Sequence, residues 1–326
     1  MPGTEPPAAG RGTVPPAPSR KGERRGDVLV SCLVDAQPKF RLQSLNWIAS
    51  LLATGTAGPE AICVHLVNDH PGVFHDVLAR IGVTVVETAP LGTAASPYCN
   101  KLAQLKSRRL REAGHVALFD ADVVVARDLS AALAGPGVRA KTADTAVPLL
   151  AQLTTLARRA GLPLPLETTP TDFGHGDTAR GYCNGGLYLF DGPTFRRLGP
   201  YWIKWAGWAL ARERLLGPSV KHADQVAFLL ALLETGQPAT LLPLAMNFPT
   251  HLKKTTYAPA HDLPPAVIHY HDRLDADGLL IPPGLPRVDA VIATVNARLR
   301  AFHKAFVPPL VTRQFRDTRE NRADAS

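Results

Sequence analysis

Short apolar runs alternate along the first part of the chain with segments whose apolar residues recur at helical spacing. The runs that predict buried strands cover residues 28–34, 61–67, 84–87 and 116–125. The segments that predict amphipathic helices cover residues 40–52, 71–81 and 98–112. Strands that alternate with helices in this way predict an α/β fold, with a mostly parallel central sheet covered by helices on both faces.

The alternation is looser after residue 125. We expect helices over 147–160, 194–215 and 223–233, and strands over 182–190 and 264–271. Residues 166–180 are polar and rich in Gly and Thr, which is typical of a mobile active-site loop.

The chain contains no internal repeat and no second apolar core, so we expect a single domain over 27–308. Residues 1–26 are rich in Pro, Gly, Ala and Arg, which predicts a disordered tail. Residues 309–326 are predicted to form a basic, polar C-terminal tail.

Two carboxylates interrupt the fourth apolar run, at Asp120 and Asp122. On a strand, residues two apart point to the same face, so both acids would project together. A hard cation such as Mg²⁺ or Mn²⁺ takes oxygen ligands and often shares them with phosphate. An isolated Asp-x-Asp can equally be a turn or a helix cap, but ligands of parallel sheets bind at the carboxyl ends of strands. Asp35 follows the first strand at the same edge.

A second feature is the late sequence His269-Tyr270-His271, which follows an apolar run. Strand alternation places both histidines on one face. A neutral imidazole is a good third ligand for Mn²⁺ beside two carboxylates. The alternative is a hydrogen-bonded pair of surface histidines.

Other candidates each have a structural alternative. Asn184 precedes Gly185-Gly186, a pair that permits close approach of a ligand or simply forms a bulge. Asp224 opens a helix, where it could cap the helix or belong to a site. Lys101 and Lys254 could neutralise phosphates or could be ordinary surface lysines.

Composition excludes several classes of protein. The net charge of +8 over 326 residues is modest and lies partly in the two end segments, which argues against nucleic-acid binding. Four cysteines show neither metal-site spacing nor a disulfide framework, so we expect a reducing, cytoplasmic location. No run of 18 apolar residues predicts a transmembrane helix, although peripheral membrane contact stays open. The phosphate-loop, dinucleotide-binding and nucleophile-elbow motifs are absent from the sequence.

In order along the chain, these features resemble nucleotide-sugar glycosyltransferases of the GT-A fold, most closely the group of glycogenin and the bacterial lipooligosaccharide galactosyltransferases. The matching segments are Val34-Asp35, Asn100-Lys101-Leu102, Phe119-Asp120-Ala121-Asp122, Asn184-Gly185-Gly186, Asp224-Gln225 and His269-Tyr270-His271. The resemblance implies a Rossmann-like nucleotide-binding half joined to an acceptor-side half. It also implies that Asp120 and Asp122 hold Mn²⁺ or Mg²⁺, with His269 or His271 completing the site.

The resemblance assigns the remaining residues as well. Asp35 and its neighbour Ala36 would hold the nucleoside, and Gln225 would lie beneath the anomeric carbon. Lys101, Asn184 and Asp224 would contact the donor sugar or its phosphates. The Gly-Lys-Pro-Trp segment that usually follows the late histidine is absent here, so Lys254 or Arg273 could replace its lysine.

We therefore expect a metal-dependent, hexosyltransferase-like enzyme. It would transfer a sugar from a nucleotide diphosphate sugar, a UDP-sugar by expectation, to an acceptor hydroxyl that the sequence does not identify. One alternative is a phosphohydrolase of the haloacid dehalogenase kind, in which Asp-x-Asp follows the first strand. Another is a nucleotide-sugar-binding protein without turnover.

Overall fold

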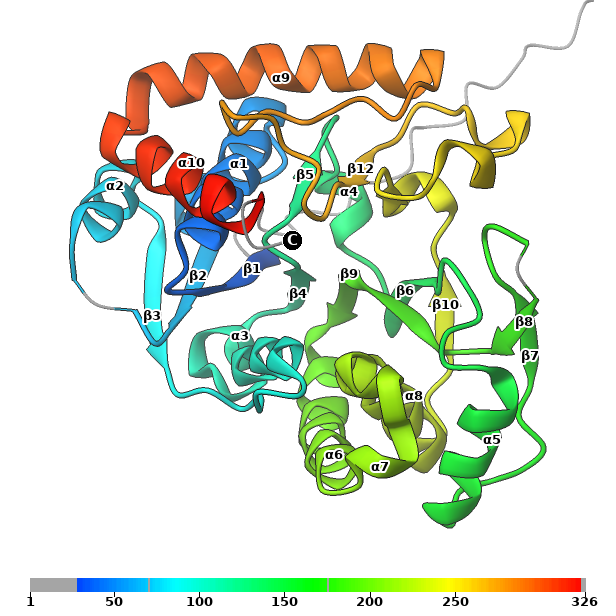
Figure 1. Cartoon of the computed structure of the whole chain (residues 1–326). Coiled ribbons are helices and arrows are strands. Elements are labelled where there is room, and N and C mark those ends of the chain that lie inside the picture. Colours follow the sequence, from blue (N-terminus) through cyan, green and yellow to red (C-terminus); the bar gives the residue numbers. More distant parts are fainter. Residues whose placement is uncertain (1–27, 70, 175, 324–326) are drawn as a thin grey trace, which may run out of the picture.

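The computed structural model describes residues 28–323 except residues 70 and 175 (Figure 1). The predicted N-terminal tail, residues 1–26, lies outside the described residues. The strands are β1 (Val28–Asp35), β2 (Ile62–Val67), β3 (Thr84–Thr88), β4 (His115–Phe119), β5 (Val123–Val125), β6 (Val138–Thr142), β7 (Thr168–Pro170), β8 (Asp177–Ala179), β9 (Cys183–Asp191), β10 (Ala239–Leu241), β11 (Phe248–Pro249) and β12 (Val267–His269). The α-helices are α1 (Pro38–Thr54), α2 (Val73–Ile81), α3 (Arg108–Glu112), α4 (Ser130–Leu133), α5 (Leu150–Arg159), α6 (Gly192–Leu210), α7 (Glu213–Leu216), α8 (Ala223–Thr235), α9 (Pro286–Phe306) and α10 (Pro309–Ala323).

The central sheet has seven strands in the order β10-β6-β9-β4-β1-β2-β3. Strands β3, β2, β1 and β4 are parallel neighbours, whereas β9 runs antiparallel to both β4 and β6. Strands β2 and β9 are almost wholly buried, as their apolar sequences require in a sheet covered on both faces. The structure thus confirms the predicted α/β fold with a mostly parallel sheet.

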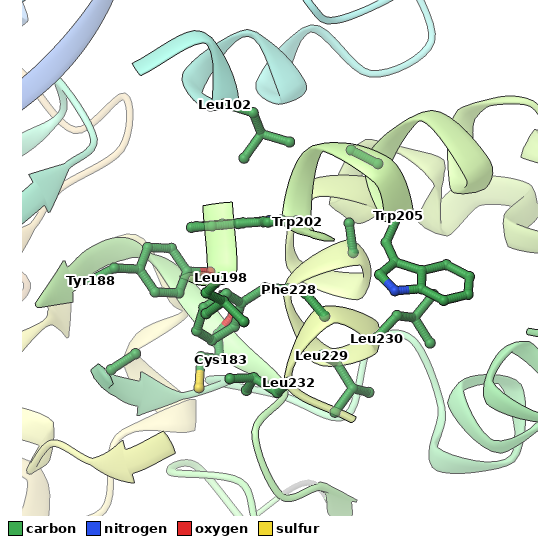
Figure 2. Close-up of a cluster of buried hydrophobic side chains, with 14 of the residues drawn as sticks. Leu102, Cys183, Tyr188, Leu198, Trp202, Trp205, Phe228, Leu229, Leu230 and Leu232 are labelled. Atoms are coloured by element: carbon green, nitrogen blue, oxygen red, sulfur yellow. Dashed lines mark hydrogen bonds between the residues drawn. The ribbon is translucent and has the colours of Figure 1, made fainter. Parts of the chain in front are cut away.

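Helices cover both faces of this sheet (Figure 1). On one face, α6 packs on α8 and on the 3-10 helix η3 (Pro97–Lys106). Figure 2 shows the core there, where Trp202 of α6, Tyr188 of β9 and Phe228 of α8 pack against one another. On the other face, α1 packs against β5, α9 and α10.

One predicted strand proves to be two. Residues 116–125 form β4 and β5, which belong to different sheets and are separated by a turn at Asp120–Asp122. Strand β5 leaves the central sheet because it pairs antiparallel with β12, which pairs in turn with β11. The two aspartates therefore lie in the connecting turn rather than at alternate positions of one strand.

Segments 98–112 and 166–180 also differ from their predictions. Residues 98–112 form most of η3 followed by the short α3, rather than one α-helix. Residues 166–180, predicted as a loop, contain the antiparallel hairpin of β7 and β8.

The segment predicted as a C-terminal tail contains helix α10. Val311 and Phe315 of α10 are buried, and the helix packs on α1. These two residues are four positions apart, so they lie on one face of an otherwise polar helix and can pack on a neighbouring helix.

Candidate active site

A cavity of about 730 Å³ opens at the carboxyl ends of β1 and β4. It lies where parallel sheets bind ligands, beside the point at which the strand order reverses. Most of the predicted site residues line it, namely Asp35, Lys101, Asp120, Asp122, Asn184, Gly185, Asp224, Gln225, His269 and His271.

Backbone hydrogen bonds fix the Asp120–Asp122 turn between the two sheets. The Asp120 amide donates to the Gly186 carbonyl at 3.1 Å, which extends the pairing of β4 with β9. The Tyr270 amide donates to the Asp122 carbonyl, also at 3.1 Å, which extends the pairing of β5 with β12. The turn therefore brings the aspartates to a histidine segment about 150 residues later in the chain.

Asp122, His269 and His271 form a group that could hold a metal ion, with ligand atoms that all lie within 4.8 Å of one another. Nε2 of His269 is 3.3 Å from Asp122 Oδ1, and Nδ1 of His271 is 3.8 Å from Asp122 Oδ2. The two imidazole rings stack with centroids 3.9 Å apart. His271 has a φ of 53°, which is uncommon for a residue with a Cβ and is found at functional sites.

The charges in this group are strongly coupled. Burial opposes ionisation of Asp122, but the neighbouring His269 outweighs burial and holds the pKa of Asp122 below its usual value. Burial likewise opposes protonation of His269, but Asp122 raises the pKa of His269 above 6.5. Burial and the charge of His269 lower the pKa of His271 to about 2. The group therefore offers one carboxylate and one neutral imidazole, with a second imidazole that a metal would have to deprotonate.

Asp120 interacts with the charges of Asp122 and His269 and also pairs with a lysine. Its Oδ1 lies 2.7 Å from Lys101 Nζ, and Lys101 Nζ also lies 3.1 Å from Asp224 Oδ2. Burial opposes the charge on Lys101, but the two carboxylates raise the pKa of Lys101 well above its usual value. Trp202 Nε1 donates to the Asp224 carbonyl at 2.8 Å, so the core beneath helps to place Asp224. Lys101 is thus a buried cation between two acids, rather than a surface lysine.

The Asn184-Gly185-Gly186 segment lies within β9, where its glycines make room for protein side chains. A Cβ on Gly185 would come within 2.6 Å of Lys101 Nζ, and a Cβ on Gly186 within 2.5 Å of His269 Nδ1. The Asn184 amide is occupied by other side chains: it donates to Asp144 at 2.6 Å and accepts from Asn247 at 2.9 Å.

Some predicted site residues that the structure describes do not line the cavity, namely Ala36, Gly186 and Lys254. The Ala36 amide donates to Asp35 Oδ1 and so helps to orient that carboxylate at the end of β1. Lys254 begins the 3-10 helix η6 (Lys254–Thr256), and its ammonium group lies beside Gly284.

The structure adds residues that the sequence analysis missed. Tyr98, Asp144 and His251 line the cavity, and Asn247 lies beneath it in contact with His269. Asp144 could have been found as an acid that follows a strand. Strand β6 was not predicted, however, because its sequence Val-Arg-Ala-Lys-Thr lacks the apolar run that marks a strand. Nothing in the sequence around Asn247 or His251 distinguishes them from loop residues.

No protein-family model and no curated protein sequence matches the chain. Among solved structures, it is similar to the galactosyltransferase LgtC in complex with donor and acceptor sugar analogues. That similarity has a TM-score of 0.52 at 15% identity, over 87% of this chain and 99% of that chain. The glycosyltransferase GlyE of Streptococcus pneumoniae TIGR4 matches with a TM-score of 0.48 at 15% identity, over 86% of this chain and 65% of GlyE.

The likeness to LgtC shows that the chain has the GT-A fold, as the sequence predicts. Within that fold, the cavity combines a carboxylate-imidazole group, a buried lysine between two acids and a partly apolar rim. Such a site can hold a divalent ion and a polyanionic ligand together.

No described helix is long and apolar enough to cross a membrane.

Proposed function

We propose that this protein is a metal-dependent glycosyltransferase that moves a sugar from a nucleotide diphosphate sugar to an acceptor hydroxyl. The observation that carries the proposal is a single GT-A cavity that places Asp122, His269 and His271 beside the Lys101–Asp120–Asp224 ion pairs. The galactosyltransferase of the same fold binds donor and acceptor sugar analogues, which supports a sugar-transfer role for the cavity.

Asp122, His269 and His271 fit a divalent ion. Asp122 supplies the oxygen that such ions prefer, and His271 stays neutral and so can donate a lone pair. When bound, the ion would stabilise the charge that develops on a departing diphosphate. Imidazole ligands suit Mn²⁺ better than Mg²⁺, so Mn²⁺ is the proposed ion.

The residues beside the metal group would bind the donor. Lys101 presents a cation beside the cavity, where phosphate oxygens can share it with Asp120 and Asp224. The Asp224 carboxylate is almost fully buried, and its Oδ1 has no hydrogen-bond partner among the described residues, so it can accept a bond from a sugar hydroxyl. Asp35, at the end of β1, would face the nucleoside, with a UDP-sugar as the proposed donor. Gln225 would lie nearest the anomeric carbon.

This arrangement would act by holding donor and acceptor together while water is excluded. Fixing two reactants in a productive geometry can supply up to about 7–11 kcal/mol of a barrier. The bond to break joins the anomeric carbon to a phosphate oxygen, and the acceptor hydroxyl oxygen forms the new bond to that carbon. The hydroxyl proton would pass to the departing nucleoside diphosphate. We propose a cytoplasmic location, in line with cysteines that are all buried and unpaired within the described part of the chain.

The phosphohydrolase alternative is not favoured. That reading needs the Asp-x-Asp pair directly after the first strand, whereas Asp120 follows β4 here.

Calorimetric titration with UDP in the presence and absence of Mn²⁺, followed by a donor-hydrolysis assay over a panel of nucleotide sugars, tests the proposal. We expect Mn²⁺-dependent binding of UDP and slow hydrolysis of one donor. Binding without hydrolysis or transfer would support the binding-protein alternative. Absence of UDP binding with Mn²⁺ would refute a UDP-sugar donor, and absence of binding and hydrolysis across the whole panel would refute the proposal.

A further inference from the structure

A chain of buried side chains runs from Asp144 through Asn184 and Asn247 to His269. Every member is at least nine-tenths buried, with exposed fractions of 9%, 8%, 0% and 3% in that order. Buried polar groups at this depth need partners, so the directions of their hydrogen bonds are constrained by chemistry.

The direction is set at Asp144. Its carboxylate can only accept, and it does so from Lys141 Nζ at 2.5 Å and from Asn184 Nδ2 at 2.6 Å. The Asn184 amide must therefore turn its oxygen the other way. Asn184 Oδ1 accepts from the Gly186 amide and from Asn247 Nδ2, both at 2.9 Å.

The reverse orientation of Asn184 is excluded by its neighbours. Rotating the amide would place its oxygen against the Asp144 carboxylate and its NH₂ group against the Gly186 N–H. One pair of acceptors would then face each other, and so would one pair of donors. In a buried site, each group left without a partner costs about 1–3 kcal/mol.

The same logic fixes the next two groups. Because Asn247 Nδ2 donates to Asn184, Asn247 Oδ1 faces Nδ1 of His269, 3.1 Å away, and can only accept. Nδ1 of His269 must then carry a proton. Its other ring nitrogen, Nε2, lies 3.3 Å from the Asp122 carboxylate, which also can only accept, so both nitrogens carry protons while no ion is bound. An ion that displaces the Nε2 proton meets a lone pair on Nε2, because Nδ1–H stays bonded to Asn247.

Gly186 makes this contact sterically feasible. A Cβ at that position would lie 2.5 Å from His269 Nδ1 and 2.7 Å from Asn247 Oδ1, closer than real Cβ atoms approach. Gly186, which was predicted to allow a ligand to approach, therefore leaves room for the hydrogen bond between Asn247 and His269.

We propose that Asn247 is a positioning residue that holds the proton of His269 on Nδ1, and so presents Nε2 to a divalent ion. The inference rests on the proposed function, because it assumes that His269 binds a metal. Partners of this kind fix the tautomer and ring orientation of metal-binding histidines, and their loss typically weakens metal affinity 10- to 100-fold.

The test uses the full chain and Mn²⁺ alone, with affinity measured by calorimetry. Asn247→Ala should bind Mn²⁺ about 10- to 100-fold more weakly than the unaltered protein. Asn247→Asp should recover only part of that loss, since a carboxylate still accepts from Nδ1–H but cannot donate to Asn184 Oδ1. Asn296→Ala removes a similarly buried asparagine that bonds only the Leu280 backbone, and should leave Mn²⁺ affinity unchanged. Unaltered Mn²⁺ affinity in Asn247→Ala would overturn the inference, as would an equal loss of affinity in Asn296→Ala.

A second measurement separates this inference from the proposed function. Nitrogen NMR of the protein loaded with diamagnetic Zn²⁺ reports which ring nitrogen of His269 carries the proton when the other binds the ion, with the signal assigned by its loss in His269→Gln. The expected result is a proton on Nδ1, and a proton on Nε2 would refute the inference even if the Asn247 variants do not fold. If the unaltered protein binds neither Mn²⁺ nor Zn²⁺, the proposed metal-dependent function fails; if it binds them but Nδ1 carries no proton, only the positioning role of Asn247 fails.

Discussion

The ammonium group of Lys101 lies 2.7 Å from Asp120 and 3.1 Å from Asp224. The lysine comes from η3, the first acid from the turn after β4, and the second from the start of α8. The ammonium group of Lys101 therefore connects three elements around the cavity and pairs with both the half-buried Asp120 and the buried Asp224.

Replacing Lys101 by methionine should reduce kcat/KM for sugar transfer by about 10²–10³-fold, because the site loses a preorganised charge near the donor phosphates. The pKa of Asp120, already raised by burial despite the lysine, should rise further. Steady-state kinetics with saturating Mn²⁺ measure the effect. Lys106→Met, an exposed lysine at the end of the same 3-10 helix, is the matched control and should keep full activity. Equal losses in both variants would contradict a specific role for Lys101.

Asp122→Asn should weaken Mn²⁺ binding by at least about 100-fold, because the neutral amide is a poor ligand and leaves His269 without its anionic partner. Removal of Mn²⁺ by a chelator should abolish transfer by the unaltered protein, and Mg²⁺ should restore less of it than Mn²⁺. Calorimetry and activity assays over the two ions check this. Asp76→Asn, on the exposed side of α2, should bind as the unaltered protein does. Transfer that persists with a chelator would remove the metal from the mechanism.

Mn²⁺ affinity should fall as the pH is lowered, because protons compete with the ion for His269. The sign follows from the raised pKa of His269: the ring stays protonated to a higher pH than a free histidine, so the metal must displace that proton. Affinity should rise with pH until it levels off above the pKa of His269, with release of about one proton per ion. His271, whose pKa is lowered to about 2, adds no proton to this count. Calorimetry in buffers of different ionisation enthalpy measures the number released, and a value near zero at pH 6 would contradict the assignment.

Asp191→Asn should destabilise the fold by about 1 kcal/mol at neutral pH. Asn caps a helix as well as Asp does, so the Thr194 amide keeps an acceptor at the start of α6. The second carboxylate oxygen, which accepts from the Gly137 amide, becomes an NH₂ group that cannot accept. Burial opposes the charge, but bonds from Thr194 and Gly137 hold the pKa of Asp191 below its usual value. The stabilisation is therefore present above the unfolded pKa and is lost as pH falls through the lower folded pKa. Urea melts at several pH values should show the two proteins converging in acid. Asp177→Asn, an exposed acid in β8, should show no comparable loss.

The sequence by itself determined the alternation of strands and helices, the GT-A type of sheet and the acids that follow β1 and β4. Apolar runs and helical spacing are local patterns, and each records which faces of an element must be buried. The same patterns pointed to His269 and His271, because a polar pair at the end of an apolar strand is visible without knowing its neighbours.

Only the tertiary structure decided which of these residues meet. It separated the acid pair, giving Asp122 to the histidines and Asp120 to Lys101, because the chain turns between two sheets at that point. It also brought in Asp144 and Asn247, whose roles come from hydrogen bonds between segments distant in sequence. The direction of those bonds depends on a carboxylate that can only accept, and no periodicity in the sequence carries that information.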